Sequence, residues 1–302
     1  MKTSRRNFIK TSAITLAGTS LFSSSLLASC KRSEIVGIQL YSVREEMKED
    51  PLGTLKQVAK MGYKHVEHAS YVHRKFYEYN AVEFKKILDD LGLKMPSGHS
   101  VLKGDHWDKK NNDFTDDWKY TIEDAAACGQ EFVVSPWLDE SLRSNYSTFM
   151  EFMEVFNKSG ELCQKSGMKF GYHNHDFEFS LSLNNENMFD LIMNNTDPDK
   201  VSMQLDIGNM YIAGAKAVDI INKYPGRFEN IHVKDMIKKE NGGEGFESTI
   251  LGNGLVGPRE VADLSREKGG TRIFIIEQES YQGIPPLECI KEDLKIMNSW
   301  GY

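Results

Sequence analysis

The sequence has few cysteines and no motif that would pair them or bind a metal through thiolates. It contains four cysteines in 302 residues, and no two are spaced C-x-x-C. Cys30 lies in the N-terminal segment, which leaves Cys128, Cys163 and Cys289 for the folded part of the chain. Because three is an odd number and no paired spacing occurs, we expect neither a disulfide framework nor a thiolate metal site.

The chain also lacks an excess of basic residues. Lysine and arginine together number 37 against 44 acidic residues, so the formal net charge is −7 and the isoelectric point is about 5.7. Proteins that bind nucleic acid need a positive surface. We therefore expect a small-molecule ligand and no nucleic acid, and the 40% of hydrophobic residues supply ample material for a core.

No segment is a convincing membrane span, and the N-terminus is typical of an export signal. "TSRRNFIK" (3–10) carries Arg5 and Arg6 and resembles a twin-arginine signal. The next segment, 11–29, is too polar and too short to cross a membrane comfortably. It ends in "LASC", which resembles a bacterial lipobox with Cys30 as the lipidated residue; the alternative is an ordinary signal peptide with a chance cysteine. We expect residues 1–33 to be signal and linker, and an exported protein that is periplasmic or anchored to the membrane through lipid on Cys30.

The rest of the chain, 34–302, reads as one domain in which short strands alternate with amphipathic helices. The helical segments 50–62 and 81–92 have apolar residues at helical spacing and end in glycine. Eight strand–helix units in about 270 residues predict a single (β/α)₈ TIM barrel, with a doubly wound open sheet as the alternative. The expected strands are 35–41, 64–69, 93–99, 131–137, 168–175, 201–206, 229–235 and 272–279.

Most of these strands end in polar or reactive side chains, which favours the barrel. In a barrel the carboxyl ends of all strands meet at one mouth, where active sites lie. The substrate-binding candidates at these ends are His99, Glu67, Trp137, His175 and Asn209.

Three of the strand ends offer a metal ligand. Asp206 stands in "QLDIGN", His232 in "IHVKD" and Glu277 in "IIEQE", and "YHNHDFE" offers a fourth. A buried carboxylate is costly unless it is paired or binds a cation. A mixed set of oxygen and nitrogen ligands suits one divalent ion such as Mn²⁺, Mg²⁺, Co²⁺, Fe²⁺ or Zn²⁺.

The chain resembles the sugar phosphate isomerase/epimerase superfamily of xylose-isomerase-like barrels. The resemblance covers the chain after the signal and is carried by "GIQLYSVR", "GYHNHDFEF", "LDIGNMYIAG", "GRFENIHVKD" and "IIEQE". In that family one divalent metal is held by Glu, Asp, His and Glu from the fifth to eighth strands. The resemblance therefore implies Asp206, His232 and Glu277 as ligands.

The sequence departs from the family pattern at two positions. Many members carry a glutamate where this chain has His173, so we expect Glu178, a few residues later, to be the fourth ligand, with His173 as the rival. Family epimerases often carry a histidine where this chain has Asn209.

These departures bear on the reaction. Epimerases of the family use two ligand glutamates as bases on opposite faces of the substrate, and a histidine in place of one weakens that scheme. Chemistry that needs one base is still open, with Glu277 or Glu279 as the base and His173, His175 or Lys234 acting on the leaving oxygen.

Three functions are compatible with these residues. The first is a metal-dependent isomerase or epimerase acting on an unphosphorylated saccharide, since an exported enzyme would meet few phosphorylated sugars. The second is a lyase or hydratase that uses the same site on keto-sugars or 3-keto-glycosides. The third is a non-enzymatic sugar-binding lipoprotein. A nuclease of the endonuclease IV type, which shares the broad fold, is disfavoured by the acidic charge and the few histidines.

Overall fold

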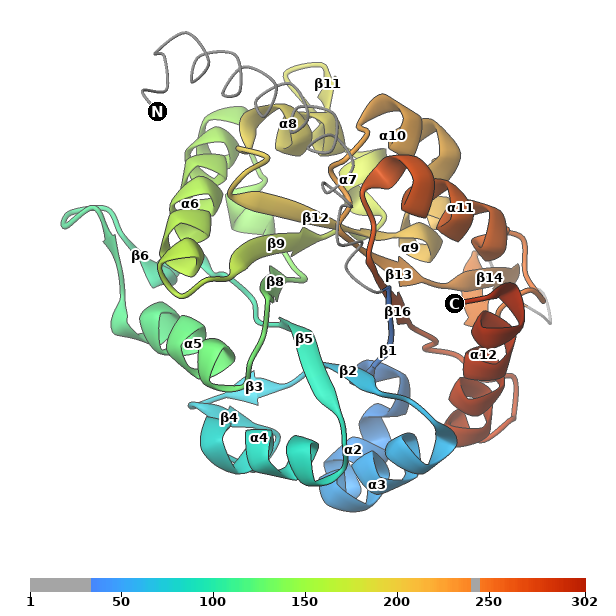
Figure 1. The fold of residues 1–302 in the computed structure, drawn as a ribbon. Helices are drawn as coiled ribbons and strands as arrows, with labels where there is room; N and C mark the ends of the chain where they lie inside the picture. The colour runs from blue at the N-terminus through green and yellow to red at the C-terminus, as the bar shows by residue number, and fades with distance from the viewer. Residues whose placement is uncertain (1–33, 240–244) are drawn as a thin grey trace, which may run out of the picture. The chain divides into compact units, whose positions relative to one another are not determined.

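Eight parallel strands close into a barrel in the computed structural model, which describes residues 34–239 and 245–302 (Figure 1). These residues belong to one unit, Glu34–Tyr302. The closed barrel confirms the predicted fold and excludes the open sheet. The export and lipid signals, Arg5, Arg6 and Cys30, lie outside the described residues, and the boundary at residue 33 stays a prediction.

The barrel strands fall within or close to the segments expected from the sequence. Hydrogen-bonded neighbours follow in the ring order β1, β2, β5, β8, β9, β12, β13 and β16, and β16 closes on β1. The strand bounds are β1 Ile35–Gln39, β2 His65–His68, β5 Lys94–His99, β8 Phe132–Ser135, β9 Lys169–His173, β12 Val201–Asp206, β13 Asn230–Val233 and β16 Ile273–Ile276.

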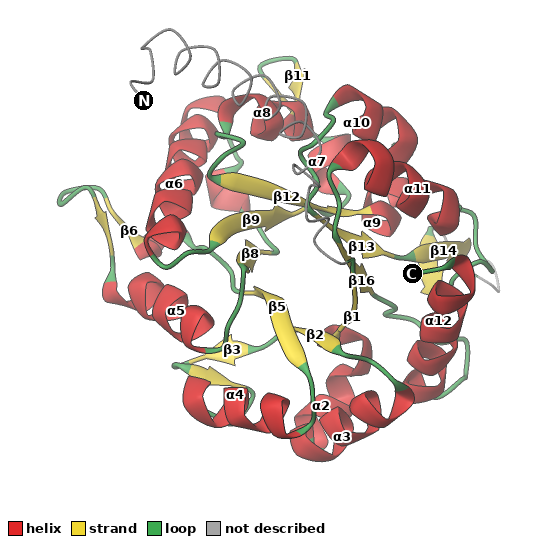
Figure 2. Ribbon diagram, viewed as in Figure 1, coloured by secondary structure: helices red, strands yellow, loops and turns green. Residues whose placement is uncertain are grey.

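Helices surround the barrel (Figure 2). In α4 the Asn80 side chain accepts from the Glu83 amide and the Glu83 side chain returns to the Asn80 amide, a reciprocal cap that starts the helix. Its apolar face is buried through Ala81, Phe84 and Leu88. The helices are α2 Arg44–Glu49, α3 Pro51–Met61, α4 Ala81–Asp90, α5 Asp116–Ala127, α6 Tyr146–Lys165, α7 Phe177–Ser180, α8 Met188–Asn195, α9 Ile207–Ile212, α10 Ala217–Lys223, α11 Pro258–Leu264 and α12 Pro286–Trp300.

Short segments decorate the loops between strands and helices. A 3₁₀ turn, Leu40–Val43, follows β1, and two more cover Gly104–His106 and Glu140–Leu142, while a π-helical turn, Ser265–Gly269, extends α11. Four two-stranded hairpins lie outside the barrel sheet. They are β3 Tyr71–Val72 with β4 Lys75–Phe76, β6 Trp107–Asp108 with β7 Asp113–Phe114, β10 Ser182–Leu183 with β11 Glu186–Asn187, and β14 Asp235–Lys238 with β15 Phe246–Thr249.

The apolar residues form two separate cores. A small cluster of Phe132, Val134, Ile273 and Ile275 alternates along β8 and β16, and Ile35 of the neighbouring β1 packs against it. The intervening Val133 and Phe274 belong to the large cluster that includes the helices. Side chains of a strand alternate between its two faces. The small cluster therefore fills the barrel interior, and the large cluster packs the helices against the outside of the barrel.

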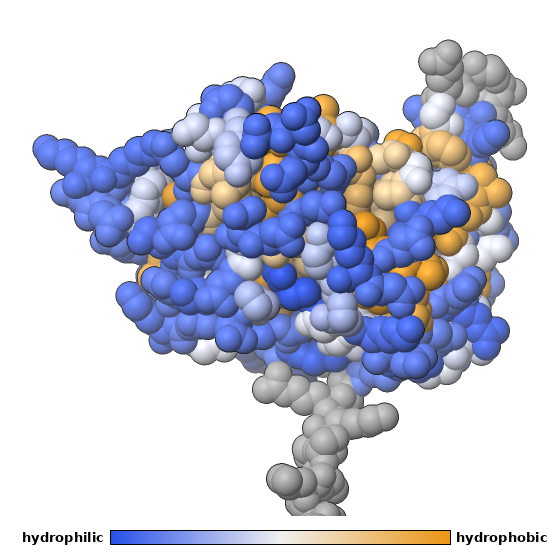
Figure 3. Space-filling view, turned by 90° about the horizontal axis from the view of Figure 1, so that it is seen from above, coloured by the Kyte–Doolittle hydropathy of each residue, from blue (hydrophilic) through white to orange (hydrophobic). Residues whose placement is uncertain are grey.

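The surface and the cysteines agree with the sequence expectations. The face shown in Figure 3 is mostly hydrophilic, with hydrophobic side chains in smaller groups. Over residues 34–239 and 245–302, no helix is long and apolar enough to cross a membrane. Cys128, Cys163 and Cys289 are buried free thiols, as the absence of a pairing pattern predicted.

Candidate functional site

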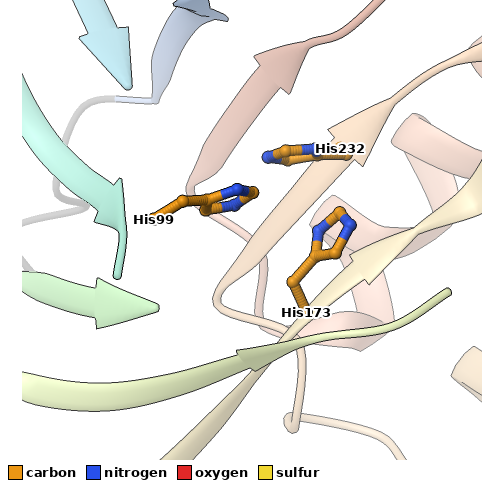
Figure 4. A group of neighbouring side chains, drawn as sticks. All are labelled: His99, His173 and His232. Carbon is orange, nitrogen blue, oxygen red and sulfur yellow. The ribbon is translucent and has the colours of Figure 1, made fainter. Parts of the chain in front are cut away.

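Four consecutive barrel strands bring four potential metal ligands together. His173 ends β9, Asp206 ends β12, His232 lies in β13 and Glu277 directly follows β16. All four are buried, and each offers a donor atom within 4.8 Å of the others. Figure 4 shows His173 and His232 pointing toward one another and toward His99 of β5. We call His173, Asp206, His232 and Glu277 the ligand group.

Asp206 divides its two carboxylate oxygens between the backbone and the ligand group. Oδ1 accepts from the amides of Gly208 and Asn209 at 2.8 and 2.7 Å, which caps the start of α9 and fixes the side chain. Oδ2 is buried without a hydrogen bond of acceptable geometry, although Lys234 Nζ lies 2.9 Å away. An oxygen left over in a buried cluster is what a bound cation would satisfy.

His232 is held between two carboxylates. Its Nδ1 lies 3.0 Å from Glu277 Oε2, and its Nε2 lies 2.6 Å from Glu67 Oε1. Burial would lower the pKa of His232, but Glu277 and Glu67 raise it to about 10, so without a cation both ring nitrogens are protonated and donate to these carboxylates. A metal at Nδ1 would replace that proton, while Nε2–H would still donate to Glu67 and orient the ring. Burial would raise the pKa of Glu67, but His99 and His232 lower it to about 2, so this residue is an anion.

His173 is oriented by a shared amide. Gln204 Oε1 lies 3.1 Å from His173 Nδ1 and 2.7 Å from His99 Nε2. The opposite ring nitrogen of His173, Nε2, lies 3.8 Å from Asp206 Oδ2. Burial, with the neighbouring histidines, lowers the pKa of His173 well below its usual value, so the ring is neutral. Its Nε2 lone pair accepts a long hydrogen bond from Asn209 Nδ2 at 3.5 Å, which a metal would replace.

Lys234 is buried among the carboxylates of the site. Its Nζ lies 2.7 Å from Glu277 Oε2, 2.9 Å from Asp206 Oδ2 and 3.3 Å from Glu279 Oε2. Burial alone would lower the pKa of this amine, but the three carboxylates raise it well above its usual value. The ammonium therefore neutralises part of the negative charge, and it is oriented as an ion-pair partner inside the protein rather than toward the cavity.

Glu178 does not fit the expectation that it completes the ligand group. Its Oε2 accepts from the His175 amide at 2.8 Å and its Oε1 accepts from the Tyr172 hydroxyl. Its carboxylate is not among the donors that gather within 4.8 Å of one another. Burial raises the pKa of Glu178 to about 7. The short turn after β9 directs this side chain into local hydrogen bonds, and the geometry favours His173 as the fourth member.

A cavity of about 680 Å³ opens over the ligand group. Seven of the predicted site residues line it: His99, Trp137, His173, His175, Asn209, Glu277 and Glu279. Glu67, expected to bind substrate, lies instead behind His99 and His232 with none of its surface exposed. It contacts His232 and Gln204 across the barrel interior, and its backbone pairs with Ser97, two residues before His99, so it lies below the mouth.

The residues that support the ligand group from behind were not predicted from the sequence. Gln39 and Gln204 donate to Glu67 at 2.7 and 2.8 Å, and Ser97 also donates to it. Gln204 precedes Asp206 by two residues, and Ser97 precedes His99 by two. Since residues two apart share a strand face, this spacing was a usable signal for inward-facing polar residues.

The donor set fits a divalent cation. Two imidazoles and two carboxylates suit Zn²⁺, Mn²⁺, Fe²⁺ or Co²⁺, because all of these ions accept mixed nitrogen and oxygen ligands. Asp206 Oδ2 makes no hydrogen bond of good geometry, and since Oδ1 caps α9, Oδ2 is the oxygen of Asp206 that remains for a cation beside Lys234.

Comparison with known proteins agrees with the fold. The chain is 28% identical over 159 residues to an inosose dehydratase of Bacillus licheniformis, an alignment that covers 47% of this chain and 52% of that protein. An inosose dehydratase of Lacticaseibacillus casei is 27% identical over 132 residues, or 40% of this chain and 43% of that protein. The chain thus spans about half the length of the curated relatives it matches.

Solved structures match over nearly the whole barrel. A sugar phosphate isomerase/epimerase from Parabacteroides distasonis is 25% identical, with a TM-score of 0.72 over 90% of this chain and 98% of that one. The IOLI protein, solved with a zinc atom bound, shares the fold at 14% identity, with a TM-score of 0.69 over 88% of this chain and 97% of that one. The sequence profile of the xylose isomerase-like TIM barrels matches residues 55–300. This chain therefore belongs to the xylose isomerase-like TIM barrel family.

Proposed function

We propose that this chain is a divalent-metal-dependent lyase acting on an unphosphorylated keto-sugar or keto-polyol. A base removes the proton next to the ketone, a double bond forms to the next carbon, and the oxygen on that carbon leaves with a proton as water or an alcohol. The observation that carries this proposal is the composition of the ligand group, two histidines and two carboxylates. The family resemblance implies a second glutamate in a two-base epimerase where this chain has His173. Elimination needs one base, and the inosose dehydratase relatives are named for such a reaction.

The ligand group would hold the metal through His173 Nε2, Asp206 Oδ2, His232 Nδ1 and Glu277. When bound, the metal would supply a Lewis acid for the carbonyl oxygen. Lys234 keeps Glu277 and Asp206 ionised at neutral pH, since its ammonium contacts both. Glu67 holds the His232 ring in place from the far side.

Two carboxylates at the cavity are candidates for the base. Glu277 belongs to the ligand group and has both His232 and Lys234 as partners. Glu279 also lines the cavity, and 40% of its side chain is exposed. His175 is placed to hydrogen-bond the leaving oxygen, because it lines the cavity and its Nδ1 has no hydrogen-bond partner. Burial lowers its pKa to about 4, so the ring is neutral, and the proton that leaves with the oxygen is the one that the base removed from the substrate.

The proposal of an unphosphorylated substrate is supported by the cations near the cavity. Arg74 lines it but is engaged by Asp124 and Glu123 at 2.7 and 2.9 Å, so its charge is already neutralised. Lys103 also lines it, and Asp117 in the same lining offsets its charge. The Trp137 ring, with 39% of the residue exposed, offers a stacking surface for a sugar face.

The second candidate is isomerisation or epimerisation of the same class of substrate. It is favoured by the 25% identical isomerase/epimerase structure from Parabacteroides distasonis. It uses the same site, but the proton returns to the substrate and no bond to oxygen breaks. A non-enzymatic sugar-binding role is disfavoured because a complete ligand group is present.

The deciding experiment measures metal content and then product. Elemental analysis of the protein should find about one divalent metal per chain, lost in His173→Ala and retained in Glu178→Gln. The opposite result would restore Glu178 as the ligand. Incubation with 3-keto-glycosides and inososes in deuterated water then separates the reactions, because elimination releases water or alcohol, whereas isomerisation incorporates deuterium without loss of mass. If the protein binds the metal but shows neither release of water or alcohol nor incorporation of deuterium, both enzyme proposals are refuted.

We also propose that the protein is exported and carries a lipid on Cys30. The support is the order of the twin-arginine and lipobox-like sequences. Metabolic labelling with a fatty acid analogue tests this, and Cys30→Ala should lose the label.

A further inference from the structure

The cavity extends well beyond the ligand group. The four ligands come from β9, β12, β13 and β16, which are consecutive in the ring, and the remaining strands, β1, β2, β5 and β8, form the other half. Segments that follow β2 and β5 also line the cavity, among them the β3–β4 hairpin and the start of α5. Its volume of about 680 Å³ lies within the usual range of small-molecule pockets and leaves room for a ligand larger than one sugar ring.

The wall of the cavity farthest from the ligand group is held together by hydrogen bonds between the β3–β4 hairpin and α5. Arg74 of the β3–β4 turn forms a bidentate pair with Asp124 of α5 at 2.7 and 3.0 Å, and the Tyr71 hydroxyl donates to the same carboxylate at 2.6 Å. His73 and Arg74 make this two-residue turn with positive φ angles of 51° and 62°, positions where asparagine and glycine are usual. An unfavourable turn held by a buried carboxylate gives a rigid wall.

Aromatic rings are exposed along this half of the cavity. Tyr41, Tyr120 and Trp137 line it with 43%, 39% and 39% of their surface exposed. The Arg74 guanidinium lies 4.2 Å from the centre of the Tyr120 ring and supports it. Exposed rings with one apolar face and a polar edge are suited to ligands that are apolar on one face and hydroxylated at the rim.

Charged side chains accompany these rings. Lys103 and Asp117 line the same part of the cavity, and Lys103 lies at the start of the Gly104–His106 turn. Both lie close enough to His106 to influence its pKa, which burial lowers. One ammonium and one carboxylate give this part of the wall no net charge, and both groups can hydrogen-bond the hydroxyl groups of a neutral ligand.

From these observations we infer a distal subsite that binds a second sugar ring, formed by Tyr71, Lys103, Asp117, Tyr120 and the turn at Arg74. The inference rests on the proposed function for the ring at the metal, and it specifies the substrate as a glycoside of the keto-sugar. In the elimination, the second sugar would leave as the alcohol when the bond from the β-carbon to the glycosidic oxygen breaks. The distal subsite retains that alcohol during the step.

The test compares unoxidised disaccharides with their component monosaccharides, so it needs no turnover. Titration calorimetry and saturation-transfer NMR would be run with cellobiose, maltose and lactose against glucose and galactose, with 4-nitrophenyl β-glucoside as a third arm. At least one disaccharide should bind about tenfold more tightly than its monosaccharides. Tyr120→Ala should remove about three- to tenfold of that gain, and Tyr120→Phe should restore it.

Tyr146→Ala is the matched control for Tyr120→Ala. Tyr146 on α6 is 38% exposed, nearly the same as Tyr120, and does not line the cavity, so Tyr146→Ala should leave all affinities unchanged. Equal affinity for disaccharides and monosaccharides, absence of any disaccharide binding, or tighter binding of the nitrophenyl glucoside than of every disaccharide would each overturn the second-sugar subsite. Thermal melting of each variant identifies misfolding. Metal content and turnover, which test the proposed function, are measured separately.

Discussion

The two halves of the barrel mouth differ in the side chains they present. The half built from β9, β12, β13 and β16 carries the ligand group and Lys234, all buried and in mutual contact. The half built from β1, β2, β5 and β8 presents exposed aromatic rings and three histidines, namely His99 at the end of β5 and His73 and His106 on the segments that follow β2 and β5. One half can therefore hold a metal and move protons, while the other shapes the cavity that receives the rest of the ligand.

Two buried glutamates show how differently the halves treat the same side chain. Glu67 of β2 reaches across the barrel to His232, and that contact, with His99, outweighs burial and lowers its pKa to about 2. Glu178, after β9, has a hydroxyl and a backbone amide as partners, and burial raises its pKa to about 7. Cationic neighbours, rather than burial, decide which carboxylate is charged.

The largest expected effect is the loss of a ligand. Asp206→Asn and His232→Ala should each remove the metal and lower turnover by at least about 100-fold, because even supporting residues of metal sites cost 10–100-fold. Elemental analysis and product formation check this. Asp219→Asn, an exposed aspartate on α10, is the control and should keep both. Full activity without metal would show that the ligand half does not act through one.

The next effect tests the buried ammonium. Lys234→Met leaves Asp206 and Glu277 without their cationic partner, so the free energy of unfolding in the presence of a chelator should fall by about 3–5 kcal/mol. Lys86→Met removes an ion pair with Asp90 in which 73% and 64% of the side chains are exposed, and should cost less than about 1 kcal/mol. Urea unfolding measures both, and equal losses would contradict the electrostatic role of Lys234.

A third prediction uses the raised pKa of Glu178. The folded protein keeps the Glu178 proton up to about pH 7, whereas the unfolded chain loses it near pH 4.5. In the wild type, the contribution of Glu178 to the free energy of unfolding should therefore decrease as the pH rises from 4.5 to 7. Glu178→Gln does not titrate, so its stability relative to wild type should increase by roughly 3 kcal/mol across that window. The free energy of unfolding of both proteins is measured with urea at several pH values, with a chelator present. If it changes with pH in the same way in both, the raised pKa of Glu178 is contradicted.

The smallest effect concerns the contact between the two halves. Glu67→Gln keeps the shape of the side chain but removes the charge that orients His232, so metal affinity should fall by about 10–100-fold. Titration calorimetry with Mn²⁺ or Zn²⁺ measures it. Ser97→Ala, which removes a partner of Glu67 but none of His232, should have a smaller effect. Unchanged affinity in Glu67→Gln would mean that the two halves are independent.

Much of the fold was readable from the sequence by itself. Alternation of short apolar runs with amphipathic segments is local information, and it predicted the eight strands and the barrel. Strand ends in a barrel must converge, so Asp206, His232 and Glu277 could be predicted to meet without coordinates.

The tertiary structure decided which neighbouring residues join them. His173 and Glu178 stand five residues apart and both carry metal-binding groups, so the sequence left them as rivals. The turn after β9 gives both oxygens of Glu178 local partners and leaves His173 Nε2 facing Asp206. The partners of Glu67 and Lys234, and the joining of the β3–β4 hairpin to α5, likewise depend on distances between residues far apart in the chain, which composition and periodicity do not encode.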